Sequence, residues 1–430
     1  MSLKSPTKTV IALAAACAFW PAWAADDDAR LKELEQKLDS SLRTIQALQQ
    51  RVEQLERRDS ANVATAPAAP ANVTARLESI ERSVAQIEAS ESVKADTGLQ
   101  IHGFADVGAG LRYQDTAAQG PRGFTVGNLD LYMTPQLSDR VKGLIELVFE
   151  YNSDGELAVD LERLQLGYTF SDALTLWGGR FHTPYGYWNT AYHHGAQLQT
   201  SLSRPRFLEF EDAGGVLPSH SVGAWATGAV RTGVGKIGYD LYAVNGDTIK
   251  AGVLDFQASG DSDGVLGYGF RAQLALGASG LSVGLNGLDM RVSGGNAAAT
   301  ASATLRVNML GAFAAYETDN WEGLAEYYAF RNDDLSGGTG IHSSNAWYAQ
   351  LGYNIGERFI PYARFERASL DQTDPYFALQ VSGQSYSRAV AGLRYNLTPT
   401  AALKAEWMRT TGDAVTGTPN RFALQYSTRF

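Results

Sequence analysis

Cysteine is almost absent: the 430-residue chain holds one, Cys17. It lies within residues 1–24, which have the features of a secretory signal: early lysines, an apolar run and the small-x-small cleavage site Ala22-Trp23-Ala24. Removal of this signal leaves a mature chain that begins at Ala25 without cysteine, which excludes disulfides as a source of stability. The alternative is a lipoprotein acylated at Cys17, but the apolar run before this residue would be short.

Long apolar runs are also missing. Beyond the N-terminus, no stretch approaches the roughly 18 uncharged apolar residues that a spanning helix needs, and the mean hydropathy is −0.20. The net charge of −10 argues against a nucleic-acid partner. Glycine (44) and tyrosine (20) are plentiful, which favours short strands and turns over a helical enzyme.

Residues 25–60 predict a coiled coil. Apolar residues follow the alternating spacing of three and four that defines the seam of such helices, with Ser41 as the one interruption. The alternative is an amphipathic helix packed on a globular core, but nothing flanks the segment for it to pack on. The seam residues are Leu31, Leu34, Leu38, Ile45, Leu48, Val52 and Leu55.

A linker and a second short helix follow the coiled coil. Residues 61–74 contain Pro67 and Pro70 in an Ala-rich run, which ends the helix and makes a semi-stiff linker. Residues 75–95 then carry a short helical seam that is out of phase with the first. Its apolar residues are Leu77, Ile80, Val84 and Ile87.

The residues from 96 to 430 alternate with a period of two. In 141–151, 388–397 and 421–430, one face is largely apolar and the other carries charges. This alternation over segments of about ten residues is typical of a transmembrane β-barrel. A soluble β-sandwich has the same alternation within each strand, so the connections must separate the two architectures.

The connections alternate between tight turns and long loops. Tyr168, Tyr316, Tyr353 and Tyr395 each come near the end of a strand, and a short polar turn follows. Tyrosine suits a membrane interface because its ring is apolar while its hydroxyl stays in water. The long loops are rich in Gly, Ser and Asp, as in outer-membrane proteins; they include residues 245–264, 292–303, 331–345 and 368–387.

These patterns predict an all-β fold, a 16-stranded antiparallel transmembrane barrel. An even strand number places both ends of the barrel on one side, so the N-terminal helix is expected in the periplasm. Barrels of about this size enclose an aqueous lumen. The predicted strands are 99–112, 123–133, 140–151, 158–170, 173–182, 220–230, 236–245, 265–278, 280–290, 304–316, 321–330, 345–354, 357–367, 387–397, 400–410 and 420–430.

The last residues, Tyr426-Ser427-Thr428-Arg429-Phe430, resemble the C-terminal signature of bacterial outer-membrane barrels, with Phe430 as the assembly signal. A coiled coil followed by one barrel resembles the trimeric porins of the dicarboxylate-channel type and, more loosely, the phosphate-selective porins. The resemblance implies an outer-membrane porin for passive diffusion of small hydrophilic solutes and a homotrimer. It concerns architecture and assigns no substrate residues.

Residues 183–219 are the longest interruption of the strand pattern. At the matching position, the third loop of porins folds inward and narrows the pore, so this segment is expected to form a constriction that selects solutes by charge. The alternative is an extracellular cap held by structural hydrogen bonds. The candidate pore residues are Arg180, His182, Arg204, Arg206, Glu209, Glu211 and Asp212.

A basic ladder is predicted on the lumen face of the last four strands. Six basic residues stand there against Glu366 and Glu406, which predicts a preference for anions such as carboxylates or phosphate. The alternative is that these charges pair across neighbouring strands and cancel. The ladder comprises Arg364, Arg388, Arg394, Lys404 and Arg421, with Arg429 at its end.

No metal, cofactor or enzymatic activity is predicted. His193 and His194 are adjacent and point opposite ways in an extended chain, and no spacing matches a recognised metal site. The Ser219-His220 pair raises the thought of a lipid hydrolase, which would need these residues on the lipid-facing side.

Two competing functions remain. The first is a structural barrel that tethers the outer membrane to peptidoglycan or to periplasmic proteins through its coiled coil. The second is a sheath around an electron carrier, which needs a wider lumen. The expected partners are otherwise outer-membrane lipid, further copies of the chain and small anionic solutes.

Overall fold

The computed structural model describes residues 101–112, 123–135, 137–151, 155–192, 195–211, 213–255, 260–261, 263–356, 358–413 and 420–430. The predicted signal peptide, coiled coil, linker and second helical segment lie outside the described residues. The barrel residues belong to one compact unit, Glu91–Phe430. Among the described residues, no helix has the length and apolar character needed to span a membrane.

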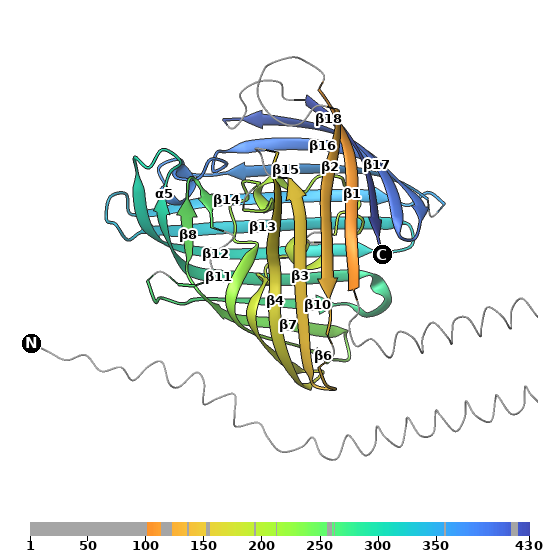
Figure 1. Ribbon diagram of the computed structural model, residues 1–430, viewed down its shortest axis with the longest axis horizontal. Coiled ribbons are helices and arrows are strands. Elements are labelled where there is room, and N and C mark those ends of the chain that lie inside the picture. Colours follow the sequence, from red (N-terminus) through yellow and green to blue (C-terminus); the bar gives the residue numbers. More distant parts are fainter. Residues whose placement is uncertain are drawn as a thin grey trace, which may run out of the picture. The chain divides into compact units, whose positions relative to one another are not determined.

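The strands form one closed antiparallel barrel (Figure 1). The sheet holds 18 strands, of which β8 (Asp247–Lys250) and β9 (Val253–Leu254) make a short extra hairpin, so sixteen strands close the barrel. Closure comes from β1 pairing with both β2 and β18, while β7 pairs with β10. The strand number and antiparallel pairing predicted from the sequence are confirmed.

The sixteen barrel strands are β1 (Ile101–Arg112), β2 (Gly123–Met133), β3 (Val141–Tyr151), β4 (Leu157–Ser171), β5 (Leu174–His182), β6 (His220–Arg231), β7 (Lys236–Val244), β10 (Gly267–Ala275), β11 (Leu281–Gly295), β12 (Ser302–Glu317), β13 (Trp321–Asp334), β14 (Ile341–Tyr353), β15 (Phe359–Ser369), β16 (Tyr386–Thr398), β17 (Ala401–Gly412) and β18 (Asn420–Arg429).

Short turns gather at one end of the barrel and long loops at the other. Only two residues join β4 to β5 and β16 to β17, whereas residues 183–219 join β5 to β6 at the opposite end. The two ends of the barrel chain meet at the short-turn end, where the Gly103 amide donates to the Phe430 carbonyl over 3.0 Å. We call the two rims the short-turn end and the long-loop end.

The two faces of each strand differ as the alternation predicts. On β4, Leu157, Val159 and Leu166 point outward and are exposed, while Asp160 and Glu162 point inward and are buried. A β-bulge opposite Glu146 and Leu147 interrupts this alternation, so Glu162 and its neighbour Arg163 both reach the interior.

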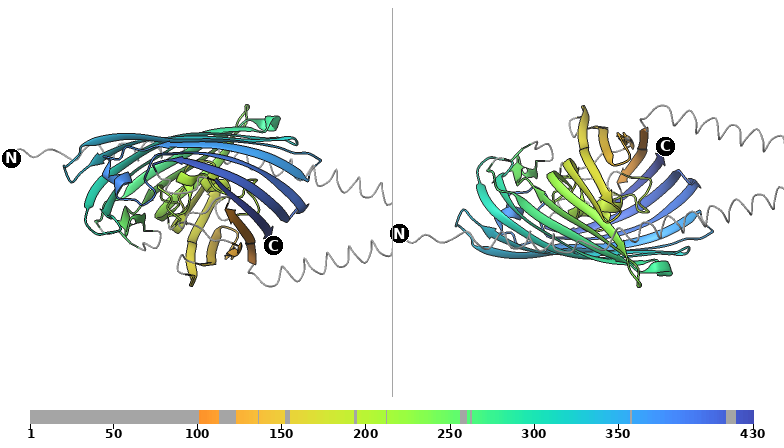
Figure 2. Two further views of the ribbon diagram at one scale, coloured as in Figure 1. Left: turned by 90° about the horizontal axis from the view of Figure 1, so that it is seen from above. Right: turned by 90° about the horizontal axis from the view of Figure 1, so that it is seen from below.

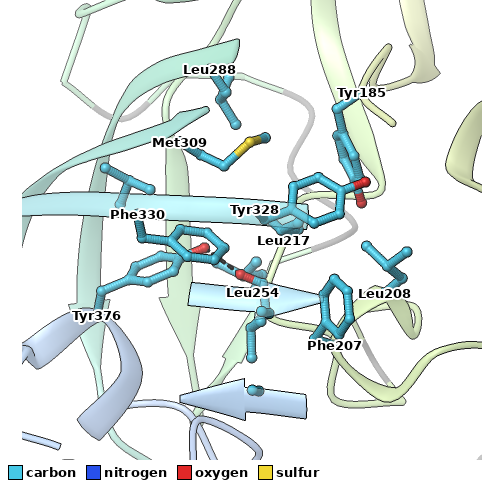
Figure 3. Packing of buried hydrophobic residues seen from close by; sticks show 14 of the residues in the cluster. Tyr185, Phe207, Leu208, Leu217, Leu254, Leu288, Met309, Tyr328, Phe330 and Tyr376 are labelled. Atoms are coloured by element: carbon cyan, nitrogen blue, oxygen red, sulfur yellow. Dashed lines mark hydrogen bonds between the residues drawn. The ribbon is translucent and has the colours of Figure 1, made fainter. Parts of the chain in front are cut away.

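The lumen is not uniformly aqueous, which corrects the sequence prediction. Tyr328 of β13 and Met309 of β12 belong to an apolar core that also includes side chains from the segment 183–219, from β9 and from α5 (Pro375–Ala378) (Figure 3). The long connections fold inward (Figure 2). They bring apolar side chains with them, so the interior beside β11–β16 is packed. The contributors from outside the barrel strands include Tyr185, Phe207, Leu208, Leu217, Leu254 and Tyr376.

Candidate functional site: the inward loop and the cavity beside it

The segment 183–219, which we call the inward loop, lies against the inner wall of β13–β17. Its described residues include two short helices, α4 (Trp188–Ala191) and the 3-10 turn η1 (Arg206–Leu208), and the rest of them have no regular secondary structure. Buried backbone N–H and C=O groups need hydrogen bonds. Charged side chains of the barrel wall supply many of them.

Glu326 of β13 holds the start of the inward loop. Its carboxylate accepts hydrogen bonds from the backbone amides of Tyr187 and Trp188, both over 2.8 Å. The hydroxyls of Tyr328 and Tyr348 donate to the same carboxylate over 2.6 Å each. The carboxylate is buried, and these four donors satisfy both of its oxygens.

The turn before these amides requires glycine. Gly186 has a φ of +60°, and a Cβ there would lie 2.1 Å from the Tyr328 hydroxyl and 2.2 Å from a Glu326 carboxylate oxygen. The Gly186 carbonyl accepts a 2.7 Å hydrogen bond from Arg271 of β10. The inward loop is therefore fixed from two sides at this point.

Two further glutamates hold the middle of the inward loop. Glu406 accepts hydrogen bonds from the backbone amides of Leu202 (3.0 Å) and Ser203 (3.2 Å). Glu366 accepts one from the backbone amide of Arg206 over 2.6 Å. Both carboxylates are buried, and both accept hydrogen bonds from backbone amides of the loop.

Three basic residues of the predicted ladder hold the loop carbonyls. Arg364, Arg394 and Lys404 are buried, with exposed fractions of 2%, 7% and 2%. Each donates to two or more carbonyl oxygens of the inward loop at hydrogen-bonding distance. The accepting carbonyls belong to Ala196, Gln197, Gln199, Ser201, Ser203 and Arg204.

The ladder therefore differs from the prediction. Arg364, Arg394 and Lys404 lie beneath the loop and bind its backbone because an inward segment without regular structure needs donors for its carbonyls. Arg388 donates to the Thr410 hydroxyl over 3.0 Å and is largely buried. Arg421 remains exposed on β18.

The guanidinium groups of the two arginines in the inward loop, Arg204 and Arg206, contact the loop itself and aromatic rings. Arg204 is buried; its Nε donates to the Leu208 carbonyl over 2.9 Å, and its guanidinium lies 3.9 Å from the centre of the Phe210 ring. The Arg206 guanidinium lies 5.1 Å from the ring centre of Tyr386. Arg204 therefore contributes to the packing of the loop.

The acidic candidates of the inward loop have separate environments. Glu211 is buried and accepts from the backbone amide of His220 over 2.9 Å and from its Nδ1 over 3.2 Å. Burial raises the pKa of Glu209 above its ordinary value. Asp212 lies outside the described residues.

A group of carboxylates and histidines joins the end of the inward loop to the opposite wall. His220, paired with Glu211, also forms an ion pair with Glu162 of β4. His182 Nε2 lies 3.1 Å from Glu146 of β3. Arg180, the remaining candidate, donates from Nε to the backbone carbonyl of Glu162 over 3.1 Å. The structure thus brings Arg180, His182 and Glu211 into one neighbourhood, which strand spacing alone did not predict.

A polar cavity of about 600 Å³ lies beside the inward loop. Its wall comes mainly from β4–β7 and β10, and the loop contributes Pro184 and Thr190. Arg271 pairs there with Asp240 over 3.4 Å, and the Trp225 indole donates to Asp240 over 3.0 Å. The charged residues and histidine that line it are Arg163, Lys236, Arg271, His182, Asp172 and Asp240.

Of the charged residues and the histidine that line this cavity, His182 is the one that the sequence also predicts as a pore residue. Arg163, Lys236 and Arg271 occur in strands whose alternation is less regular than that of the last four. A bulge places Arg163 inward, and β-bulges are not readable from alternation. The available signal was the charge of these three residues within predicted strands.

The described ranges hold no group of three or more His, Cys, Asp or Glu side chains placed to bind a metal ion. His193 and His194 lie outside those ranges.

One Gly-x-Ser-x-Gly sequence occurs, at residues 280–284. Its Ser282 lies within strand β11, where it pairs with Ala275 and Ala315 of the neighbouring strands. It therefore does not form the strand-to-helix turn of a hydrolase nucleophile.

No family model and no curated protein matches the chain. Solved structures do match. The trimer form of in-vitro folded OmpT, an outer membrane protein of Vibrio cholerae, is 12% identical with a TM-score of 0.50, over 77% of this chain and 99% of its own. An anion-selective porin from Comamonas acidovorans is also 12% identical with a TM-score of 0.50, over 77% and 98%. The likeness shows that this chain has the sixteen-stranded fold of bacterial outer-membrane porins.

Proposed function

We propose that the chain is an outer-membrane porin through which small hydrophilic solutes diffuse passively. The observation that carries the proposal is the polar cavity that remains inside a closed barrel beside the anchored inward loop. The outward face of the strands is apolar, as a lipid-embedded barrel requires. We assign the short-turn end, where β1 begins and β18 ends, to the periplasm.

The proposed selectivity is for anions such as carboxylates or phosphate. Three basic residues line the cavity, against two acidic ones, Asp172 and Asp240. A low-dielectric wall focuses the field of such an excess and raises the local concentration of counter-ions. The likeness to a porin described as anion-selective gives this preference additional, weaker support.

Conductance of the full chain in planar bilayers tests the channel, and the reversal potential in a salt gradient tests the selectivity. Stepwise conductance with anion preference is expected. Lys236→Glu replaces an exposed cavity cation and should shift the reversal potential toward cations. Folded protein without conductance contradicts the channel, whereas a cation-selective wild type contradicts only the anion preference.

We further propose a homotrimer, supported by the trimer form recorded for the OmpT structure. The coiled-coil residues do not fix the number, because Ile45 and Val52 at a with Leu48 and Leu55 at d would even favour two strands. Mass measurement in detergent decides between these states. A trimer that survives deletion of residues 25–94 would show that the barrel holds the assembly.

A further inference from the structure

A row of arginines follows the outward face of the barrel near its long-loop end. Arg331 of β13, Arg367 of β15 and Arg409 of β17 are exposed. Each stands on the face that also carries exposed apolar residues, such as Tyr327, Phe365 and Trp407 on the same three strands. Inward neighbours such as Asn332, Glu366 and Glu406 are buried, which fixes the orientation of the three arginines.

The register places the arginines along one slanted line. Arg331 is opposite Ser343 on β14, and Arg367 is opposite Trp347 four residues further toward the short-turn end. Arg409 is opposite Ala389, which pairs with Phe365 and so lies two residues beyond Arg367 in the same direction. Because the strands of a barrel tilt, residues at one height are not paired directly. From each strand to the next, they are displaced in the register in one constant direction. The arginines therefore lie at similar heights.

That height corresponds to the edge of an apolar band. On β13, exposed Trp321 begins the strand at the short-turn end, and Arg331 stands ten residues later. Ten residues rise about 33 Å, which at a tilt of about 40° spans about 25 Å, the thickness of the apolar band in such barrels. Aromatic residues mark each edge of that band. The arginines lie at or beyond its upper edge, at the level of lipid headgroups.

The three guanidinium groups have no carboxylate partner among the described residues. Arg306 of β12 differs, because it forms a bidentate pair with Asp289 over 2.8 and 2.5 Å. Alternate strands are about 10 Å apart, so each of the three arginines is available to a separate anionic group. Phosphate matches the planar donor pair of arginine.

We propose that Arg331, Arg367 and Arg409 form a binding site for phosphate-bearing lipid headgroups of the outer leaflet. The site rests on the proposed membrane location and assigns a partner to the outer surface of the barrel. The aromatic residues at the edge of the apolar band lie where the acyl chains end, and the arginines bind the phosphates just above them.

The test uses the full chain reconstituted in phosphatidylcholine vesicles, with or without lipid A, a diphosphorylated glycolipid. The readout is the lipid A that stays with the barrel after detergent extraction and purification. The wild type is expected to retain lipid A, and dephosphorylated lipid A should be retained far less. An interfacial arginine accounts for roughly a fivefold change in affinity, so Arg331→Gln, Arg367→Gln and Arg409→Gln together should weaken retention on the order of a hundredfold.

Arg358→Gln is the matched control, since Arg358 is exposed in the turn before β15 at the opposite, short-turn end. It should retain lipid A like the wild type. Equal retention by the triple variant, or equal retention of dephosphorylated lipid, overturns the site while leaving the channel proposal intact. Failure of the wild type to insert into phosphatidylcholine vesicles overturns the membrane location and the lipid site together.

Discussion

The two sides of the barrel interior use charged residues in different ways. On the β13–β17 side, Arg364, Lys404 and Glu326 are buried and bind the backbone of the inward loop. On the β4–β10 side, Lys236 and Asp172 face an open polar cavity. The comparison teaches that an inward-pointing charge does not by itself define a pore. It defines one only where no loop covers it.

The largest expected effect comes from removing the most heavily used anchor. Glu326→Ala leaves two backbone amides and two tyrosine hydroxyls of the packed side without their acceptor. Hydrogen bonds to a charged group are worth about 1.5–3 kcal/mol each, so we expect a loss of several kcal/mol and a displaced loop. Thermal unfolding in detergent and single-channel conductance, with larger and noisier steps, measure the two results. Conductance indistinguishable from the wild type would contradict the anchoring role.

A smaller effect is expected at the turn that precedes this anchor. Gly186→Ala forces a Cβ against Tyr328 and Glu326 at a positive φ, which costs roughly 1–3 kcal/mol. The same two measurements apply. Gly178→Ala is the matched control, because no atom lies within 4 Å of its Cβ position and its φ is not in the left-handed range. If both variants lost equal stability, the close approach at Gly186 would not be the cause.

The third prediction separates the two sides by selectivity. Lys404→Met removes a ladder cation that donates to the carbonyls of Gln199 and Ser201. It should lower the unfolding temperature. The reversal potential, measured while the protein is still folded, should stay nearly unchanged. Lys236→Gln should shift the reversal potential and leave the unfolding temperature nearly unchanged, because this exposed lysine lines the cavity. A large shift in reversal potential from Lys404→Met with an intact loop would restore the ladder as a selectivity element.

The smallest expected effect concerns pH at the long-loop end. Hydrogen bonds from Thr373 and His342 lower the pKa of Asp371 to about 2, whereas an unfolded aspartate titrates near 3.9. A lowered folded-state pKa stabilises the fold above pH of about 4, and this contribution is lost as the pH falls toward 2. Unfolding temperatures of the wild type and Asp371→Asn should therefore converge over that interval. A constant difference down to pH 2 would contradict it.

Strand positions were readable from the sequence because each strand records its environment in its own alternation. Val141–Tyr151 and Asn420–Arg429 show this directly: their outward residues are apolar wherever lipid would contact them. In the structure, the segment 183–219 joins β5 to β6. Its role as a constriction that selects solutes stays a prediction.

The site was less predictable for a physical reason. Arg364 and Arg421 both occupy inward positions in regular strands, so the alternation of each strand predicts the same lumen-facing role for both. Arg364 is 2% exposed under the loop while Arg421 is exposed. The difference depends on a loop more than 140 residues earlier in the chain, whose carbonyl oxygens accept hydrogen bonds from Arg364.

The closed antiparallel barrel, its sixteen strands and the rim that bears the long loops follow from the sequence, because alternation and turn spacing are local properties. Which inward charges stay accessible to solutes follows from the three-dimensional packing of the loop. A loop without regular structure must find partners for its buried backbone groups, and the charges of the facing wall supply them. That requirement is set by residues distant in the chain, so no single strand records it.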